Sequence, residues 1–159
     1  MNQTYLLIGG NLGNRQENLQ KARELIAAGT GQILLRSSIY ETEAWGIQEQ
    51  PAFLNQVLLL STPLDPHQLL LRILEIEHLM DRERTQKFGP RLIDIDILFF
   101  NNEVIAEPGL SIPHPHLQDR RFTLEPMNEI APGLMHPVIN KSIKDLLLQC
   151  PDPLAVKKL

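Results

Sequence analysis

The sequence has a single cysteine, no long apolar run and no excess of positive charge, and each shortage excludes a class of protein. Cys150 is the only cysteine, so no internal disulfide can form and nothing indicates an oxidising compartment. No apolar run approaches membrane-spanning length, and the N-terminus lacks the basic lead and apolar core of a signal peptide. We therefore expect a cytoplasmic protein without a membrane partner.

The charge balance excludes nonspecific nucleic-acid binding, which requires a broad basic surface. The formal net charge is −4 over 159 residues, and 43% of the residues are hydrophobic. That composition is ordinary for a globular protein, and the length is sufficient for a substantial core. Since internal repeats, low-complexity segments and linkers are also lacking, we expect residues 1–159 to form one domain.

Charge is concentrated in residues 81–100, DRERTQKFGPRLIDIDILFF, where a basic half precedes an acidic half. The alternation in IDIDILFF predicts a strand with two different faces. One face is expected to carry Ile93, Ile95, Ile97 and Phe99. The opposite face is expected to carry Asp94 and Asp96, followed by Leu98 and Phe100.

The two aspartates of this strand are candidate metal ligands. Residues two apart on a strand point the same way and lie roughly 6–7 Å apart, so Asp94 and Asp96 should repel each other. A hard cation between them would remove that cost, and Mg²⁺ is commonly held by one or two carboxylates plus phosphate oxygens. The alternative is a solvent-facing strand with two ordinary surface aspartates. The basic half of the stretch favours a phosphate ligand nearby.

The remaining patterns predict an α+β fold. Apolar runs at 4–8, 32–42 and 52–62 indicate strands, and helical periodicity follows the first and third of them. The second helix is expected to start after Asp65, with Pro66 in its first turn and Gln68 completing a capping box. From Pro108 the chain holds eight of its twelve prolines, which predicts irregular structure with a last helix over 142–150. This order predicts a ferredoxin-like βαββαβ core, an antiparallel sheet with helices packed on it, and an irregular C-terminal extension with short helices.

Several other residues allow two interpretations. The GGNLGN loop is either a phosphate cradle or, more simply, a tight turn, because it matches neither established phosphate-loop spacing. Trp45 is either a cap over the core or a lid over a flat ligand. Asn55 could read the edge of a heterocycle or bond a neighbouring loop. His114 and Arg120 could face phosphate or belong to a surface loop, and the prolines around the histidines give no zinc spacing.

The segment GPRLIDIDIL resembles the signature of the 6-hydroxymethyl-7,8-dihydropterin pyrophosphokinase family of folate biosynthesis. IGGNLGN, YET, FLNQV, the basic loop, IPHP with RRF, and EIAP also resemble the family's motifs, in its order and at close to its spacing. The resemblance covers nearly the whole chain and implies the family's ferredoxin-like fold. It implies transfer of the β,γ-pyrophosphoryl group of ATP to the pterin hydroxymethyl oxygen, with release of AMP. The expected partners are ATP and a reduced pterin, with the chain acting as a monomer.

The resemblance also implies a role for each site residue. Asp94 and Asp96 would hold two Mg²⁺ ions that bridge the ATP phosphates. Arg82 and Arg91 match basic residues of the family's catalytic loop. The residues that match nucleotide-side positions are Glu77, Arg84, Lys87, Ile97 (through its backbone), Ser111, His114 and Arg120. The pterin pocket would be formed by Thr42, Phe53, Asn55 and Phe122, with Trp45 in a loop that closes over it.

The chain departs from the family at a few positions, and two rival functions remain open. Family members usually have Ser, Tyr and Trp where Gly10, Phe53 and Phe88 stand, often proline at 43 or 44, and in some cases Arg at 109. These changes bear on affinity and loop behaviour more than on the reaction. One rival is a regulatory module that binds Mg-ATP without transferring anything. The other is a metal-dependent phosphodiesterase, which would need more carboxylates and a water-positioning base.

Overall fold

A six-stranded antiparallel sheet forms the centre of the molecule, and the computed structural model describes residues 1–43, 51–81 and 92–159. The strand order is β5-β1-β4-β3-β8, and β2 pairs with the same edge of β4 as β3, further along that strand. The strands are β1 (Asn2–Gly10), β2 (Gln32–Arg36), β3 (Tyr40–Thr42), β4 (Phe53–Thr62), β5 (Asp94–Phe100) and β8 (Val156–Lys158).

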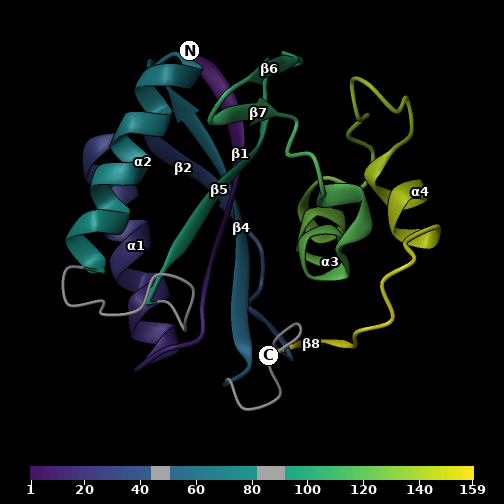
Figure 1. Ribbon diagram of the computed structural model, residues 1–159, viewed down its shortest axis with the longest axis horizontal. Coiled ribbons are helices and arrows are strands. Elements are labelled where there is room, and N and C mark those ends of the chain that lie inside the picture. The colour runs from purple at the N-terminus through teal and green to yellow at the C-terminus, as the bar shows by residue number, and fades with distance from the viewer. Residues whose placement is uncertain (44–50, 82–91) are drawn as a thin grey trace.

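Helices cover both faces of this sheet, as Figure 1 shows. On one face lie α1 (Arg15–Gly29) and α2 (Pro66–Met80), and on the other lie α3 (Arg121–Ile130) and α4 (Ile143–Leu148). Each face has its own apolar cluster, one with α1 and α2 and one with α3 and α4. The elements β1, α1, β2, β4, α2 and β5 follow the predicted βαββαβ order. The predicted α+β class with an antiparallel sheet is therefore confirmed.

The second helix begins as the sequence predicts. The Asp65 side chain accepts a hydrogen bond from the Gln68 backbone N–H (2.8 Å), and the Gln68 side chain accepts one from the Asp65 N–H (2.9 Å). This capping box satisfies two N–H groups that the helix itself cannot. The buried stripe of α2 is made of Pro66, Leu69, Ile73, Ile76 and Met80. No helix in the described ranges is both long and apolar enough to cross a bilayer.

The predicted alternation along β5 is right for its first half and wrong for its end. Leu6 of β1 pairs with Ile97, but the next residue, Tyr5, pairs with Phe99, so Leu98 is an extra residue in the strand. Such a bulge exchanges the two faces beyond it. Phe99 therefore packs with α3 and α4, and Phe100 packs with α1 and α2, opposite to the prediction.

Two other predictions about strands need correction. The single strand expected over 32–42 is two strands. Ser37 still bonds to Val57 of β4, but there the Val57 N–H donates to the Ser37 side chain, and regular pairing resumes only at Tyr40. The C-terminal region is also less irregular than its prolines suggest. It contains a hairpin of β6 (Ile105–Glu107) and β7 (Leu110–Ile112), a 3₁₀ turn at Leu117–Asp119, and β8, which pairs with β3. The predicted last helix is present but shorter, with Ser142 as its N-cap.

Candidate active site

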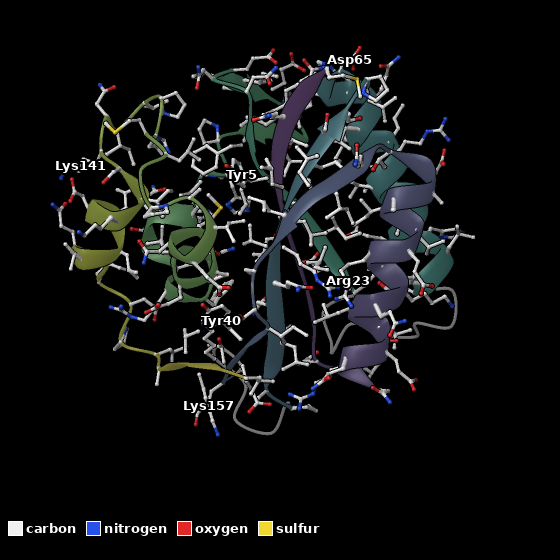
Figure 2. All side chains as sticks on the ribbon, turned by 180° about the vertical axis from the view of Figure 1, so that it is seen from behind. Tyr5, Arg23, Tyr40, Asp65, Lys141 and Lys157 are labelled. Carbon is white, nitrogen blue, oxygen red and sulfur yellow. The ribbon has the colours of Figure 1, made fainter. Side chains whose placement is uncertain are left out.

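The strand register brings residues from four strands into a single row, called here the site row. Gly9 of β1 lies opposite Asn55 of β4 on one side and opposite Asp94 of β5 on the other. Tyr40 of β3 lies opposite Asn55 and completes the row. Residues directly opposite in antiparallel strands share a face, so all four belong to the face on which α3 packs. Figure 2 shows Tyr40 between the sheet and α3.

The neighbouring rows add further predicted residues to the same face. Asp96 lies opposite Leu7, which is buried in the cluster beneath α3 and α4. Phe53 lies opposite Thr42 on the other side of the site row. The predicted metal ligands and three of the predicted pterin residues therefore share one face of the sheet, although they are distant in the sequence. Phe122 joins them from the first turn of α3, where it is partly buried against the same cluster.

Two polar side chains on this face, Thr42 and Asn55, are buried in the part of the chain that the structure describes. Thr42 is 3% exposed, and its Oγ1 has no hydrogen-bond partner. Asn55 is 6% exposed, and the described residues offer its side-chain amide no hydrogen bond. A buried polar group left unpaired costs roughly 1–3 kcal/mol, so native structures rarely keep one without a use. A hydroxyl and an amide placed this way can bind the edge of a polar heterocycle.

Asp94 and Asp96 are partly buried on the edge strand of the sheet, and a third carboxyl group lies beside them. Glu77 of α2 accepts a hydrogen bond from the Ile95 backbone N–H through Oε2 (2.8 Å). Burial, together with the charges of Asp94 and Asp96, raises the pKa of the Glu77 carboxyl to about 8. Three carboxyl groups this close hold a proton readily, and a bound cation would take its place. The oxygen donors fit Mg²⁺.

The chain after β7 brings a histidine to the same edge. The His114 backbone N–H donates to the Leu98 carbonyl (3.0 Å), which fixes this segment beside β5. Burial lowers the pKa of the His114 imidazole to about 4, and the positive charges of Arg120 and His116 add to the effect. Its Nδ1 accepts from the His116 N–H (3.2 Å), so the neutral ring carries its proton on Nε2. That N–H is a donor suited to a phosphate or hydroxyl oxygen.

The other residues predicted to contact the nucleotide are spread more widely around the β5 edge of the sheet. The Arg120 guanidinium lies 5.7 Å from the centre of the Phe122 ring, next to the predicted pterin side. Ser111 is exposed on β7. Ile97 has a buried side chain, and the alternation of strand hydrogen bonds turns its backbone to the same outer edge as Ile95. Trp45, Arg82, Arg84, Lys87 and Arg91 lie outside the described residues.

Gly9 and Tyr40 belong to motifs that resemble the family, but no sequence pattern assigned a role to Gly9, Tyr40 or Glu129, which the structure places around the site. Gly9 was part of a presumed turn, and only the strand register shows it between Asn55 and Asp94. Glu129 of α3 accepts hydrogen bonds from the Tyr40 hydroxyl (2.6 Å) and the Ser38 backbone N–H (3.0 Å). Glu129 lies 89 residues after Tyr40 in the sequence, so no local pattern could indicate this contact.

Known proteins that are similar to this chain over most of their length are described as pterin pyrophosphokinases. The chain matches the model of the 7,8-dihydro-6-hydroxymethylpterin-pyrophosphokinase (HPPK) family over residues 5–132. It is 42% identical over 141 residues to 2-amino-4-hydroxy-6-hydroxymethyldihydropteridine pyrophosphokinase of Aquifex aeolicus, covering 89% of this chain and 88% of that protein. It is 35% identical over 160 residues to the protein of the same name from Methylorubrum extorquens, covering 100% and 99% of the two chains.

Longer proteins contain a similar region. The chain is 38% identical over 139 residues to the folic acid synthesis protein fol1 of Pneumocystis carinii, but these are 87% of this chain and only 19% of that protein. Among solved structures, a Plasmodium falciparum HPPK-DHPS chain matches with a TM-score of 0.79 at 20% identity. The match covers 93% of this chain and 45% of that one, and at this identity it supports the fold alone.

Proposed function

The chain belongs to the 7,8-dihydro-6-hydroxymethylpterin-pyrophosphokinase (HPPK) family, and we propose a role in the family reaction for each site residue that the structure describes. The protein is an enzyme of folate biosynthesis that transfers a pyrophosphoryl group from ATP to the hydroxymethyl group of 6-hydroxymethyl-7,8-dihydropterin. The family uses ATP with Mg²⁺. That residues 1–159 form one domain and act as a cytoplasmic monomer stays a prediction from the sequence.

Asp94 and Asp96 are proposed to hold two Mg²⁺ ions together with the phosphates of ATP. They share a face and lie beside a carboxyl group whose pKa they help to raise, so a cation would relieve their repulsion. Among the described residues, no three His, Cys, Asp or Glu side chains are placed to hold a metal by themselves. This supports a site completed by phosphate and water oxygens. Magnesium, when bound, offsets phosphate charge and stabilises the entering and leaving oxygens.

The pterin is proposed to bind over the β4 side of the site row. The Asn55 amide and the Thr42 hydroxyl, both buried, would hydrogen-bond the edge of the pterin ring, and the Thr42 hydroxyl has no hydrogen-bond partner in the described part of the protein itself. Phe53 and Phe122 would lie against the two ring faces, since flat rings stack favourably on aromatic side chains. The observation that carries this proposal is the register that puts Asn55 and Asp94 on either side of Gly9.

ATP is proposed to bind along the outer edge of β5. His114 would donate from Nε2 to a phosphate or ribose oxygen, and Arg120 would offset phosphate charge. Ser111 and Glu77 would contact the nucleoside, and the outward backbone of Ile97 would bind adenine. Arg82, Arg84, Lys87 and Arg91 are assigned to the phosphates and Trp45 to the pterin side by family resemblance alone.

The reaction requires alignment more than covalent help from the protein. The pterin hydroxymethyl oxygen attacks the β-phosphorus of ATP and its proton passes to solvent. The bond from the β-phosphorus to the oxygen that bridges to the α-phosphate breaks, and AMP leaves with that oxygen. With the pterin on the β4 side and the phosphates on the β5 side, the hydroxymethyl group would lie above Gly9, between them. Holding both reactants in this geometry supplies much of the rate increase in phosphoryl transfer.

A turnover assay with resolved nucleotide products tests these assignments. The purified protein with ATP, Mg²⁺ and the dihydropterin should form AMP only when pterin is present. Asp94→Asn and Asp96→Asn should each lower this rate by about 100-fold or more, because each removes charge stabilisation of the transition state. Asp145→Asn, at an exposed aspartate of α4, is the matched control and should leave the rate unchanged. Full activity in both site variants would overturn the metal assignment.

A further inference from the structure

Gly9 occupies the middle of the site row, and the space above its Cα is filled by another residue. A β-carbon built on Gly9 would lie 2.2 Å from Asn55 Oδ1 and 2.8 Å from the Leu54 carbonyl oxygen. Both distances are shorter than real β-carbons allow. The Asn55 carboxamide therefore leans across β1, over the position of the missing side chain and toward the strand that carries Asp94.

Backbone conformation does not explain a glycine here. In the described chain, the glycines with positive φ are Gly13 and Gly109, so Gly9 has a strand conformation that alanine adopts equally well. Its neighbours in the sheet are paired normally on both sides. What glycine provides at this position is room for the Asn55 side chain and for the Leu54 carbonyl oxygen beside it.

We propose that Gly9 is a positioning residue that determines where the Asn55 amide meets the pterin. Without a β-carbon at position 9, the Asn55 amide can lie close to the surface of the sheet. It then presents its donor and acceptor toward the end of the site row that carries Asp94. A side chain at position 9 would push the amide back toward β4 and shift the bound pterin away from the β-phosphorus. This inference rests on the proposed assignment of Asn55 to the pterin site.

Gly31 provides a matched control for the strain that any new β-carbon creates. A β-carbon on Gly31 would lie 2.1 Å from the Ser61 carbonyl oxygen, as close a contact as the one at Gly9. Gly31 directly precedes β2, whose first residue pairs with Ser61, and Asn55 lies near the opposite end of β4. Gly31→Ala should therefore destabilise the fold without touching the site.

The experiment compares Gly9→Ala, Asn55→Ala, the double variant and Gly31→Ala with the unaltered protein. Pterin affinity is measured by titration with a nonhydrolysable ATP analogue and Mg²⁺ present, and affinity for the analogue is measured separately. Gly9→Ala should weaken pterin binding about tenfold, the equivalent of losing one to two hydrogen bonds, and leave analogue binding within about twofold. Because Gly9 acts through Asn55, the double variant should bind pterin no more weakly than Asn55→Ala alone.

The outcomes separate this inference from the proposed function. If Asn55→Ala binds pterin normally, the assignment of Asn55 fails, and the role of Gly9 fails with it. If Asn55→Ala weakens binding but Gly9→Ala does not, only the role of Gly9 is wrong. Additive losses in the double variant, or an equal loss of pterin affinity in Gly31→Ala, would also overturn it. Should Gly9→Ala fail to fold, the single variant Asn55→Gln, which keeps glycine at position 9 but moves the amide by one carbon, replaces it. Weaker pterin binding with unchanged analogue binding in this variant supports the positioning role, and unchanged pterin binding overturns it.

Discussion

At the scale of single residues, the site face keeps polar groups that folding alone does not need. The Thr42 hydroxyl is buried without a hydrogen-bond partner among the described residues, and the Asn55 side chain is buried close to it in the same sheet. The unpaired hydroxyl costs free energy in the protein without ligand and regains it when a ligand supplies the missing hydrogen bond. Binding and stability should therefore respond in opposite directions when such a group is removed.

Thr42→Val tests this opposition, because valine has nearly the shape of threonine and replaces only the hydroxyl with a methyl group. We expect the free energy of unfolding to rise by about 1 kcal/mol, since an unpaired buried hydroxyl disappears. Pterin affinity should fall by about tenfold for the loss of one hydrogen bond. Urea unfolding and pterin titration measure the two effects. A drop in stability would mean that the hydroxyl contributes to the fold and is not held for a ligand.

His136 makes a second residue-scale prediction, which concerns pH. The side chain is 5% exposed, and its Nδ1 accepts from the Val138 N–H (3.1 Å) and the Ile139 N–H (3.0 Å). Burial lowers the pKa of His136, so the folded protein binds fewer protons here than the unfolded chain. This contribution to the free energy of unfolding is therefore complete above about pH 6.5, the unfolded pKa, and is lost as the pH falls toward the folded value.

The measurement is urea unfolding at pH 7 and pH 5 for the unaltered protein and for His136→Asn. Asparagine can accept the same two N–H groups but does not titrate in this range, so its stability should fall less between the two pH values. His114 also has a lowered pKa and titrates in both proteins, which is why the difference between them is the relevant quantity. Equal losses in both proteins would remove His136 as a source of the pH dependence.

At the scale of elements, the Glu129 carboxylate links α3 to β3 and to the residues just before it. Glu129 accepts hydrogen bonds from the Tyr40 hydroxyl (2.6 Å), the Ser38 N–H (3.0 Å) and the Ser38 hydroxyl (3.0 Å). These residues lie in and just before β3, which carries Thr42, whereas α3 carries Phe122. The contact therefore links the two sides of the proposed pterin pocket.

Glu129→Ala should lower both stability and pterin affinity. Hydrogen bonds to a charged group contribute roughly 1.5–3 kcal/mol, and the exposure of Glu129 places the expected loss of stability near the lower end. Pterin affinity should fall several-fold, with little change in affinity for the ATP analogue. Glu125→Ala, one turn earlier on the same helix, removes a long contact with Arg121 (3.8 Å) and a negative charge near Tyr40, but none of the hydrogen bonds that Glu129 accepts, and is the control. Equal pterin affinity in both variants would show that the link does not shape the pocket.

The elements also show what the sequence can predict. The capping box at Asp65 and the start of α2 were predictable because capping depends on residues only three apart. The reversal of Phe99 and Phe100 was not, because the bulge at Leu98 is defined by pairing with Tyr5, more than 90 residues away. Strand β8 was missed for the same reason. Its three residues form a strand only because the edge of β3 lies beside them.

At the scale of the whole molecule, the two faces of the sheet have different roles: one holds apolar core alone, and the other also carries the proposed site. The face under α1 and α2 is packed with apolar side chains, whereas the other face is apolar beneath α3 and α4 and polar along the site row. Motif resemblance supplied the proposal of which residues form the site. It could not show that Gly9 lies between Asn55 and Asp94, because residues 9, 55 and 94 become neighbours only through strand order and register.

This arrangement predicts that metal, nucleotide and pterin stabilise the folded protein in a dependent order. A ligand that binds only the folded state raises its stability, by about 2.7 kcal/mol at a hundredfold excess over Kd. A nonhydrolysable ATP analogue with Mg²⁺ should therefore raise Tm, and added pterin should raise it further. EDTA should abolish both increases, because without the cation Asp94 and Asp96 repel the phosphates that position the pterin. If the rise in Tm persisted undiminished with EDTA present, neither carboxylate would act through a metal. Protein cations alone would then have to offset the repulsion between the two aspartates and the phosphates.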